Sequence, residues 1–124
     1  MATYEDARRI VAELPGASEV DVPEWGHPTF RVNNKMFASG APDSPTMSMK
    51  ATKEEQAELV AAHPETFAVA PYVGRFGWIQ VQLSALDEDE LRELLVEAWR
   101  QIAPKRLVRT FDPPPPADPP RRPR

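Results

Sequence analysis

The chain has 124 residues, of which 41% are hydrophobic and 27% are charged, and its formal net charge is −4. This length and this composition are typical of one globular domain in water. The absence of cysteine excludes disulfides, thiolate metal sites and cysteine nucleophiles.

The N-terminal stretch MATYEDARRIVAEL lacks the features of a targeting segment. Glu5, Asp6 and Glu13 interrupt its apolar residues, so it has no hydrophobic region of the signal-peptide type. The chain also has no apolar run approaching the roughly 18 residues that a membrane-spanning helix needs. We therefore expect a cytoplasmic protein that has no membrane partner.

The last twelve residues, PPPPADPPRRPR, differ in composition from the rest of the chain. Most of them are prolines, which cannot join a helix or a sheet ladder. We predict a disordered or polyproline II tail at 113–124 after one domain at 1–112, acting as a solvated end, a groove ligand or a basic tether. The tail holds three arginines and one aspartate, so residues 1–112 alone carry −6. A body of this sign is a poor non-specific binder of phosphate backbones.

The first predicted helix begins after Thr3. Thr3 and Asp6 have the spacing of a capping box, and apolar residues recur at helical spacing as far as Leu14. Pro15 and Gly16 end the helix, because proline cannot continue the hydrogen-bond ladder and glycine accepts a left-handed turn.

Four strands are predicted next, at 18–22, 29–32, 35–39 and 46–50. Asn33 and Asn34 separate the second strand from the third, and asparagine tolerates the positive φ angles of a two-residue hairpin turn. In the fourth strand two methionines alternate with Ser48 and Lys50, so we expect the methionines and the polar residues on opposite faces.

A second helix is predicted after a cap at Thr52, and Pro64 terminates it. Residues 65–77 are interpreted as irregular or weakly extended. The segment WIQVQL at 78–83 alternates in the manner of a strand with one buried face.

The last predicted helix begins at an Asp87–Glu90 capping box and carries an apolar stripe as far as Ile102. The segment KRLVR then leads into the tail. Together these elements predict a single-domain α+β fold, in which helices pack on an antiparallel β-sheet in two layers. The predicted order is α-β-β-β-β-α-β-α.

Segments in a fixed order resemble the MmcQ/YjbR family: LPG after the first helix, WGHPTFRVNNKMFAS, MSMK, EEQAELVAAHPETFAVAPYVGRFGWIQVQL and DEDELRELLVEAWRQIAPKRL. The likeness covers roughly residues 4–107 and leaves out the tail. It implies a two-layer α+β fold of the secretion-chaperone or cell-division-domain type, and DNA binding through β-hairpin wings. The recurring polar positions of the family correspond to Lys35, Lys50 and the aromatic-basic run that ends at Trp78.

Two groups of residues around the hairpin are candidates for binding. Strand geometry allows Lys35, Lys50 and Arg31 to share a solvent face, which is either a binding patch or a solvated face with lysines as edge protection. Trp25 and His27 precede the hairpin in WGHP, which is read either as part of this site or as a structural turn.

The segment PYVGRFGW offers a second candidate. Tyr72, Phe76 and Trp78 interleave with Arg75 and two glycines, a pattern that suits base stacking if the rings are exposed, or core packing if they are not. It is neither a Walker A loop nor a GxGxxG motif.

A third candidate is the basic C-terminal arm. Lys105, Arg106 and Arg109 follow the last helix, where cations also complement the helix dipole.

No catalytic constellation is recognisable in the sequence. The serines lack a GxSxG context, and the two histidines have no metal-ligand spacing. We therefore expect a monomeric, non-enzymatic protein that has no cofactor and no metal, and the resemblance implies that it is a DNA-binding protein of the MmcQ/YjbR type. The alternative is an α+β domain that binds a protein or a small ligand through the same face.

Overall fold

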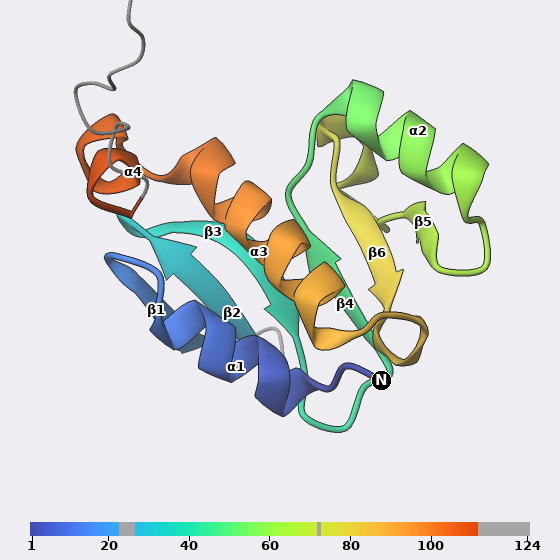
Figure 1. The fold of residues 1–124 in the computed structure, drawn as a ribbon, viewed down its shortest axis with the longest axis horizontal. Coiled ribbons are helices and arrows are strands. Elements are labelled where there is room, and N and C mark those ends of the chain that lie inside the picture. The colour runs from blue at the N-terminus through green and yellow to red at the C-terminus, as the bar shows by residue number, and fades with distance from the viewer. Residues whose placement is uncertain (23–26, 72, 112–124) are drawn as a thin grey trace, which may run out of the picture.

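The structure is a computed structural model, and it describes residues 1–22, 27–71 and 73–111. Its elements, shown in Figure 1, are α1 (Tyr4–Ala12), β1 (Ala17–Val22), β2 (His27–Val32), β3 (Lys35–Gly40), β4 (Thr46–Met49), α2 (Lys53–Ala62), β5 (Phe67–Val69), the 3-10 turn η1 (Gly74–Phe76), β6 (Ile79–Gln82), the 3-10 turn η2 (Leu83–Ala85), α3 (Glu88–Ile102) and α4 (Lys105–Phe111).

The strands of the described residues form one six-stranded antiparallel sheet in the order β1-β2-β3-β4-β6-β5. This arrangement confirms the predicted α+β class with helices packed on an antiparallel sheet. The structure adds two short elements to the predicted order. β5 lies within the segment expected to be irregular or weakly extended, and α4 lies where the chain was expected to lead into the tail.

The helices gather on one face of the sheet. α1 lies over β1, α3 over β3 and β4, and α2 against β5 (Figure 1). Met47 and Met49 are almost fully buried on this face, as predicted. The side chains that alternate with the core residues project from the other face, which we call the open face; among them are Arg31, Ser39, Ser48 and Gln80.

Predicted capping residues begin three of the helices. Thr3 Oγ1 accepts a hydrogen bond from the Asp6 amide at 3.2 Å, and Asp6 Oδ2 accepts one from the Thr3 amide at 3.0 Å. Asp87 and Glu90 form the same reciprocal pair at the start of α3. At the start of α2, Thr52 accepts a hydrogen bond from the backbone of a residue three positions on. Each cap satisfies amide groups that the first turn of a helix leaves unpaired.

Trp99 of α3 is fully buried and joins three segments of the chain. Its indole Nε1 donates a hydrogen bond to the carbonyl oxygen of Pro15 at 3.0 Å, and its ring centroid lies 5.2 Å from that of Phe111. Gly16 has a φ of 70°, and a Cβ there would lie 2.8 Å from Leu107 Cδ1. α4 therefore rests directly on the turn between α1 and β1.

The hairpin between β2 and β3 turns at two asparagines, as predicted. Asn33 and Asn34 have φ angles of 53° and 62°, and the flanking residues Val32 and Lys35 are paired. Two successive left-handed residues are the signature of a type I′ turn, which matches the twist of the strands. The pairing shifts between Phe30 and Arg31, which inserts a β-bulge into the hairpin.

Substitutions at Asn34 test this turn. We expect Asn34→Gly to change the free energy of unfolding by less than about 0.5 kcal/mol, because glycine adopts positive φ without steric cost. We expect Asn34→Ile to lower it by about 1–2 kcal/mol, because a β-branched side chain clashes in the left-handed region. Urea denaturation measures both. Equal stability of the two variants would contradict the left-handed geometry.

Candidate nucleic-acid interface

Three strand termini meet at one end of the sheet. β3 begins at Lys35, β4 ends at Met49 and β6 begins at Ile79. The antiparallel pairing of β3 with β4 and of β4 with β6 brings these termini to the same end. Lys50 continues this pairing, since its amide donates a hydrogen bond to the carbonyl oxygen of Phe37 at 2.9 Å. Lys35 and Lys50 therefore lie at the same end of the sheet.

α4 brings three more cations to this end. Leu107 and Val32 both approach Gly16, so α4 packs beside the strand residue that pairs with Lys35. Figure 1 shows α4 next to the turn of the β2–β3 hairpin. The three cationic side chains of α4 are all exposed; they belong to Lys105, Arg106 and Arg109.

Lys50 and Arg75 meet at the η1 loop. Lys50 Nζ donates hydrogen bonds to the carbonyl oxygens of Ala51 at 3.1 Å and Phe76 at 2.8 Å. The Arg75 guanidinium lies 4.8 Å from the centroid of the Phe76 ring. Lys50 thus holds the loop that displays Arg75. We call the whole surface the basic end; it consists of Lys35, Lys50, Arg75, Lys105, Arg106 and Arg109.

The lysines at the hairpin do not share a face, which corrects the sequence expectation. Lys35 pairs with Val32, whose side chain is in the core, whereas Lys50 follows the buried Met49 and so points to the open face. The cause is the β-bulge, which leaves Phe37 without a partner in β2 and changes the alternation along β3. At this end of the sheet, Lys35 therefore lies toward the helical face and Lys50 toward the open face.

Arg31 lies on the open face with Lys50. It is half-buried, and its Nε donates a hydrogen bond to Thr29 Oγ1 at 3.0 Å. Its cross-strand partners are Ser18 of β1 and Met36 of β3. Further along the open face the sheet presents the hydroxyl and amide side chains of Ser39, Ser48 and Gln80. The sequence places no carboxylate in the segments 27–42, 44–53, 66–86 and 98–111, which build this face and the basic end.

Trp78 is only 6% exposed, so its ring is not available for stacking and the expectation of a binding role for it is corrected. Phe76, two residues earlier, is 55% exposed and offers its ring to solvent. The sequence left base stacking and core packing open for both aromatics, and the family resemblance pointed to Trp78. Only the three-dimensional path of the loop shows which of the two rings is outside.

The loop that carries Phe76 is held in place by α2 and by the segment that precedes it. Gln56 of α2 is buried, and its Nε2 donates hydrogen bonds of 2.7 Å to the carbonyl oxygens of both Gly74 and Trp78. Gly77 has a φ of 94°, and a Cβ there would lie 2.7 Å from the carbonyl oxygen of Ala51. No local sequence pattern indicated the role of Gln56, because its partners lie 18 and 22 positions further along the chain.

The structure describes only part of the predicted site. Trp25, Tyr72 and the side chain of His27 lie outside the described residues, as does the predicted tail at 113–124. The backbone of His27 begins β2 and pairs with Val22. Within the described ranges, no group of three or more histidine or acidic side chains is arranged to hold a metal ion.

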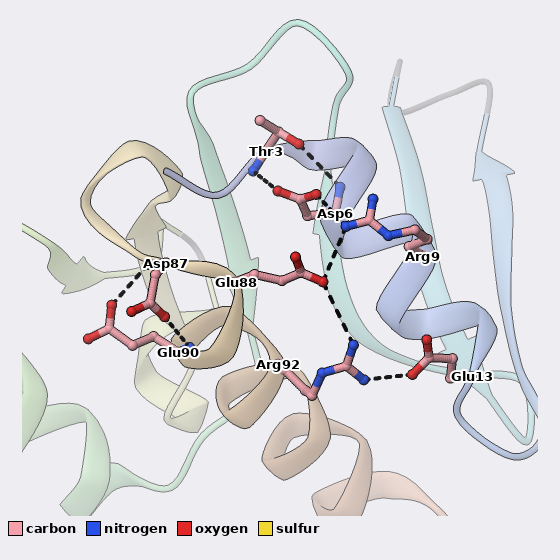
Figure 2. A network of polar contacts seen from close by, with 8 residues as sticks. All are labelled: Thr3, Asp6, Arg9, Glu13, Asp87, Glu88, Glu90 and Arg92. Carbon is pink, nitrogen blue, oxygen red and sulfur yellow. Dashed lines mark hydrogen bonds and ion pairs between the residues drawn. The ribbon is translucent and has the colours of Figure 1, made fainter.

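The helical layer, in contrast, pairs its arginines with carboxylates (Figure 2). Arg9 of α1 contacts Asp6 at 2.6 Å and Glu88 of α3 at 3.2 Å. Arg92 of α3 contacts Glu13 at 2.6 Å and Glu88 at 3.8 Å. The contacts of Arg9 with Glu88 and of Arg92 with Glu13 link α1 and its C-cap to α3, so the cations of this network serve the packing of the two helices.

Contacts within the helical layer shift the pKa values of Asp6 and Tyr4. The ion pair with Arg9, helped by hydrogen bonds from Thr3, holds the pKa of Asp6 below its ordinary value of 3.8. Burial raises the pKa of Tyr4 above its usual range, and the hydrogen bond that its hydroxyl donates to Glu19 at 2.7 Å raises that pKa further.

The fold and its exposed cations define an open-faced, two-layer α+β domain. The YjbR family model matches residues 12–101, so the chain belongs to the YjbR family. The sequence resemblance to MmcQ/YjbR proteins is thereby confirmed.

Curated relatives share most of the chain. The uncharacterized proteins Rv2570 of Mycobacterium tuberculosis (strain ATCC 25618 / H37Rv) and Mb2600 of Mycobacterium bovis (strain ATCC BAA-935 / AF2122/97) are each 28% identical to it over 129 residues. The match covers 90% of this chain and 96% of each relative.

A solved structure has the same fold. The crystal structure of the Deinococcus radiodurans protein DR2400, of the domain family DUF419, superposes with a TM-score of 0.76 at 24% identity. The likeness covers 92% of this chain and 91% of DR2400. In the described part of the present chain, no helix has the length and apolarity to cross a membrane.

A substitution at Gln56 tests the support of the η1 loop. We expect Gln56→Leu to lower the free energy of unfolding by about 2 kcal/mol, because it leaves two carbonyl groups without their donor. Amide hydrogen exchange of residues 73–78 should become faster. The control is Gln82→Leu on an exposed position of β6, which should change stability by less than about 0.5 kcal/mol. Unchanged exchange in Gln56→Leu would show that the loop does not depend on this side chain.

The pH dependence of stability tests the Asp6 ion pair. A folded-state pKa below the unfolded value means that Asp6 stabilises the fold above about pH 4, and that this contribution is lost as the pH falls. We therefore expect Asp6→Asn to melt below the wild type at about pH 7, and the two melting temperatures to converge as the pH falls through the lowered pKa of Asp6. Asp43→Asn, in the exposed loop after β3, is the control. A gap that persists at the lowest pH would exclude the ion pair as its cause.

Proposed function

We propose that this protein is a non-enzymatic DNA-binding protein that contacts nucleic acid with its basic end and the adjoining open face. The support comes from where its cations lie. The arginines of the α1–α3 network contact carboxylates, whereas the basic end is built from segments without a single Asp or Glu. A segregated cationic surface is what an acidic protein needs in order to bind a phosphate backbone.

The observation that carries the proposal is the packing of α4 beside the hairpin. Leu107 and Val32 meet at Gly16, and this contact joins the three exposed cations of α4 to Lys35 across a gap of about seventy residues in sequence. A hairpin turn and a short basic helix then project from one end of the molecule. Both elements present charge to solvent at the same end.

The exposed Phe76 gives the surface a second kind of contact. An aromatic ring beside a guanidinium suits stacking on an unpaired base, while the cations follow the backbone. Duplex DNA keeps its bases stacked internally. We therefore expect single-stranded probes to gain from Phe76 and duplex probes to depend on the cations alone.

Fluorescence anisotropy with labelled single-stranded and duplex DNA at about 50 mM salt tests the proposal. The acidic body keeps binding weak, and affinity should fall steeply as salt rises. The triple variant Lys105→Ala/Arg106→Ala/Arg109→Ala should lose at least about tenfold in affinity, with a salt slope reduced by roughly 0.9 per lost contact on duplex DNA. Phe76→Ala should weaken single-stranded binding only.

The matched control for charge is Arg8→Ala compared with Lys35→Ala. Each removes one exposed cation, but Arg8 contacts Glu5 and Glu19 in the helical layer. Lys35→Ala should weaken binding and Arg8→Ala should not. Absence of binding to every probe at low salt, or an equal loss in both variants, would refute the proposal.

A further inference from the structure

A groove lies between α2 and α3, on the helical side of the sheet. It has a volume of about 560 Å³, which is within the range of small-ligand and peptide sites. Figure 1 shows its two walls, α2 and α3, on either side of the β6 region. Its floor is apolar and is made by Leu59, Phe67, Leu86 and Leu94.

Carboxylates line the rim on both sides. Glu90, Glu93 and Glu97 lie along one face of α3 because they are three and four residues apart, and they span about 10 Å of helix. Glu55 of α2 and Glu65 after it line the opposite side. His63 is the other titratable group on the rim, and its Nδ1 lies 4.0 Å from Glu65 Oε2.

Leu59 and Leu94 are only half-buried, although they pack against the core. A floor of this kind leaves apolar area in contact with water, and covering it is favourable. The surrounding glutamates repel phosphate, so the groove is electrostatically unsuited to nucleic acid. An occupant must therefore combine apolar side chains for the floor with positive charge for both rims.

We infer that this groove binds a cationic amphipathic segment of a partner protein, with leucine-like side chains on the floor and lysine or arginine against the glutamate rims. About two turns of helix match the length of the rim from Glu90 to Glu97. An amphipathic helix in a groove is an established mode of peptide recognition. The inference does not depend on DNA binding, since it uses the opposite charge and another surface.

The test is a labelled peptide of about fourteen residues, made only of leucine and lysine with its leucines on one helical face. Binding to the full-length protein is measured by anisotropy and should saturate. A peptide of the same composition with scrambled order has the same charge but no apolar face. It should bind at least about tenfold more weakly if the floor contributes.

Two double variants separate the groove from general acidity. Glu55→Gln/Glu93→Gln removes one carboxylate from each rim and should weaken peptide binding about three- to tenfold, the range expected for two exposed ion pairs. Glu54→Gln/Glu58→Gln removes two exposed carboxylates of α2 outside the groove and should change binding less than about twofold. DNA affinity should not fall in either variant, so failure here and failure of DNA binding are distinguishable.

Several outcomes would overturn the inference. Equal weakening by both double variants, or equal binding of the two peptides, would mean unspecific attraction. Displacement of the labelled peptide by a synthetic peptide of residues 112–124 would assign the groove to the tail of this chain. Self-association in sedimentation velocity that Glu55→Gln/Glu93→Gln abolishes would assign it to a second copy.

Discussion

The position of α4 at the basic end depends on the burial of one tryptophan. The Trp99 indole donates a hydrogen bond to the carbonyl oxygen of Pro15, and its ring packs on Phe111. The α1–β1 turn and α4 are therefore both held at the same position of α3. Gly16 then lets Leu107 approach the turn more closely than any side chain would allow. Without this contact α4 would be a seven-residue amphipathic segment with too few hydrogen bonds to hold its helix.

Acidic and basic side chains in this protein gather in different parts of the fold. Carboxylates occupy the helices and cap their first turns, where the dipole favours them, and the arginines among them contact these carboxylates. Strands β2 to β6, the η1 loop and α4 come from segments without a carboxylate, whereas β1 holds Glu19 and Asp21. The net charge of −4 therefore describes neither surface: one end is cationic, and the α2–α3 groove is anionic.

Local signals in the sequence were sufficient for most of the fold. Both capping boxes, the asparagine turn and the alternation around Met47 and Met49 depend on residues within four positions of one another, and the structure contains each of them. β5 and α4 depend on distant contacts and were not predicted. The prediction that Lys35 shares a face with Lys50 was wrong for a similar reason. A bulge at Phe37, which depends on the pairing of β3 with β2, reverses the orientation of Lys35.

Lys50 shows how a polar residue can support a site by holding the backbone of a neighbouring loop. Its ammonium group is bonded to two backbone carbonyls, one of which belongs to Phe76, and Gln56 bonds to the carbonyls on either side of that residue. An exposed phenylalanine on a loose loop would lose rotational freedom on binding and gain little affinity. A loop fixed by two buried or half-buried donors presents the ring already ordered. The polar position at Lys50 and the aromatic-basic run that follows are therefore parts of one structural unit.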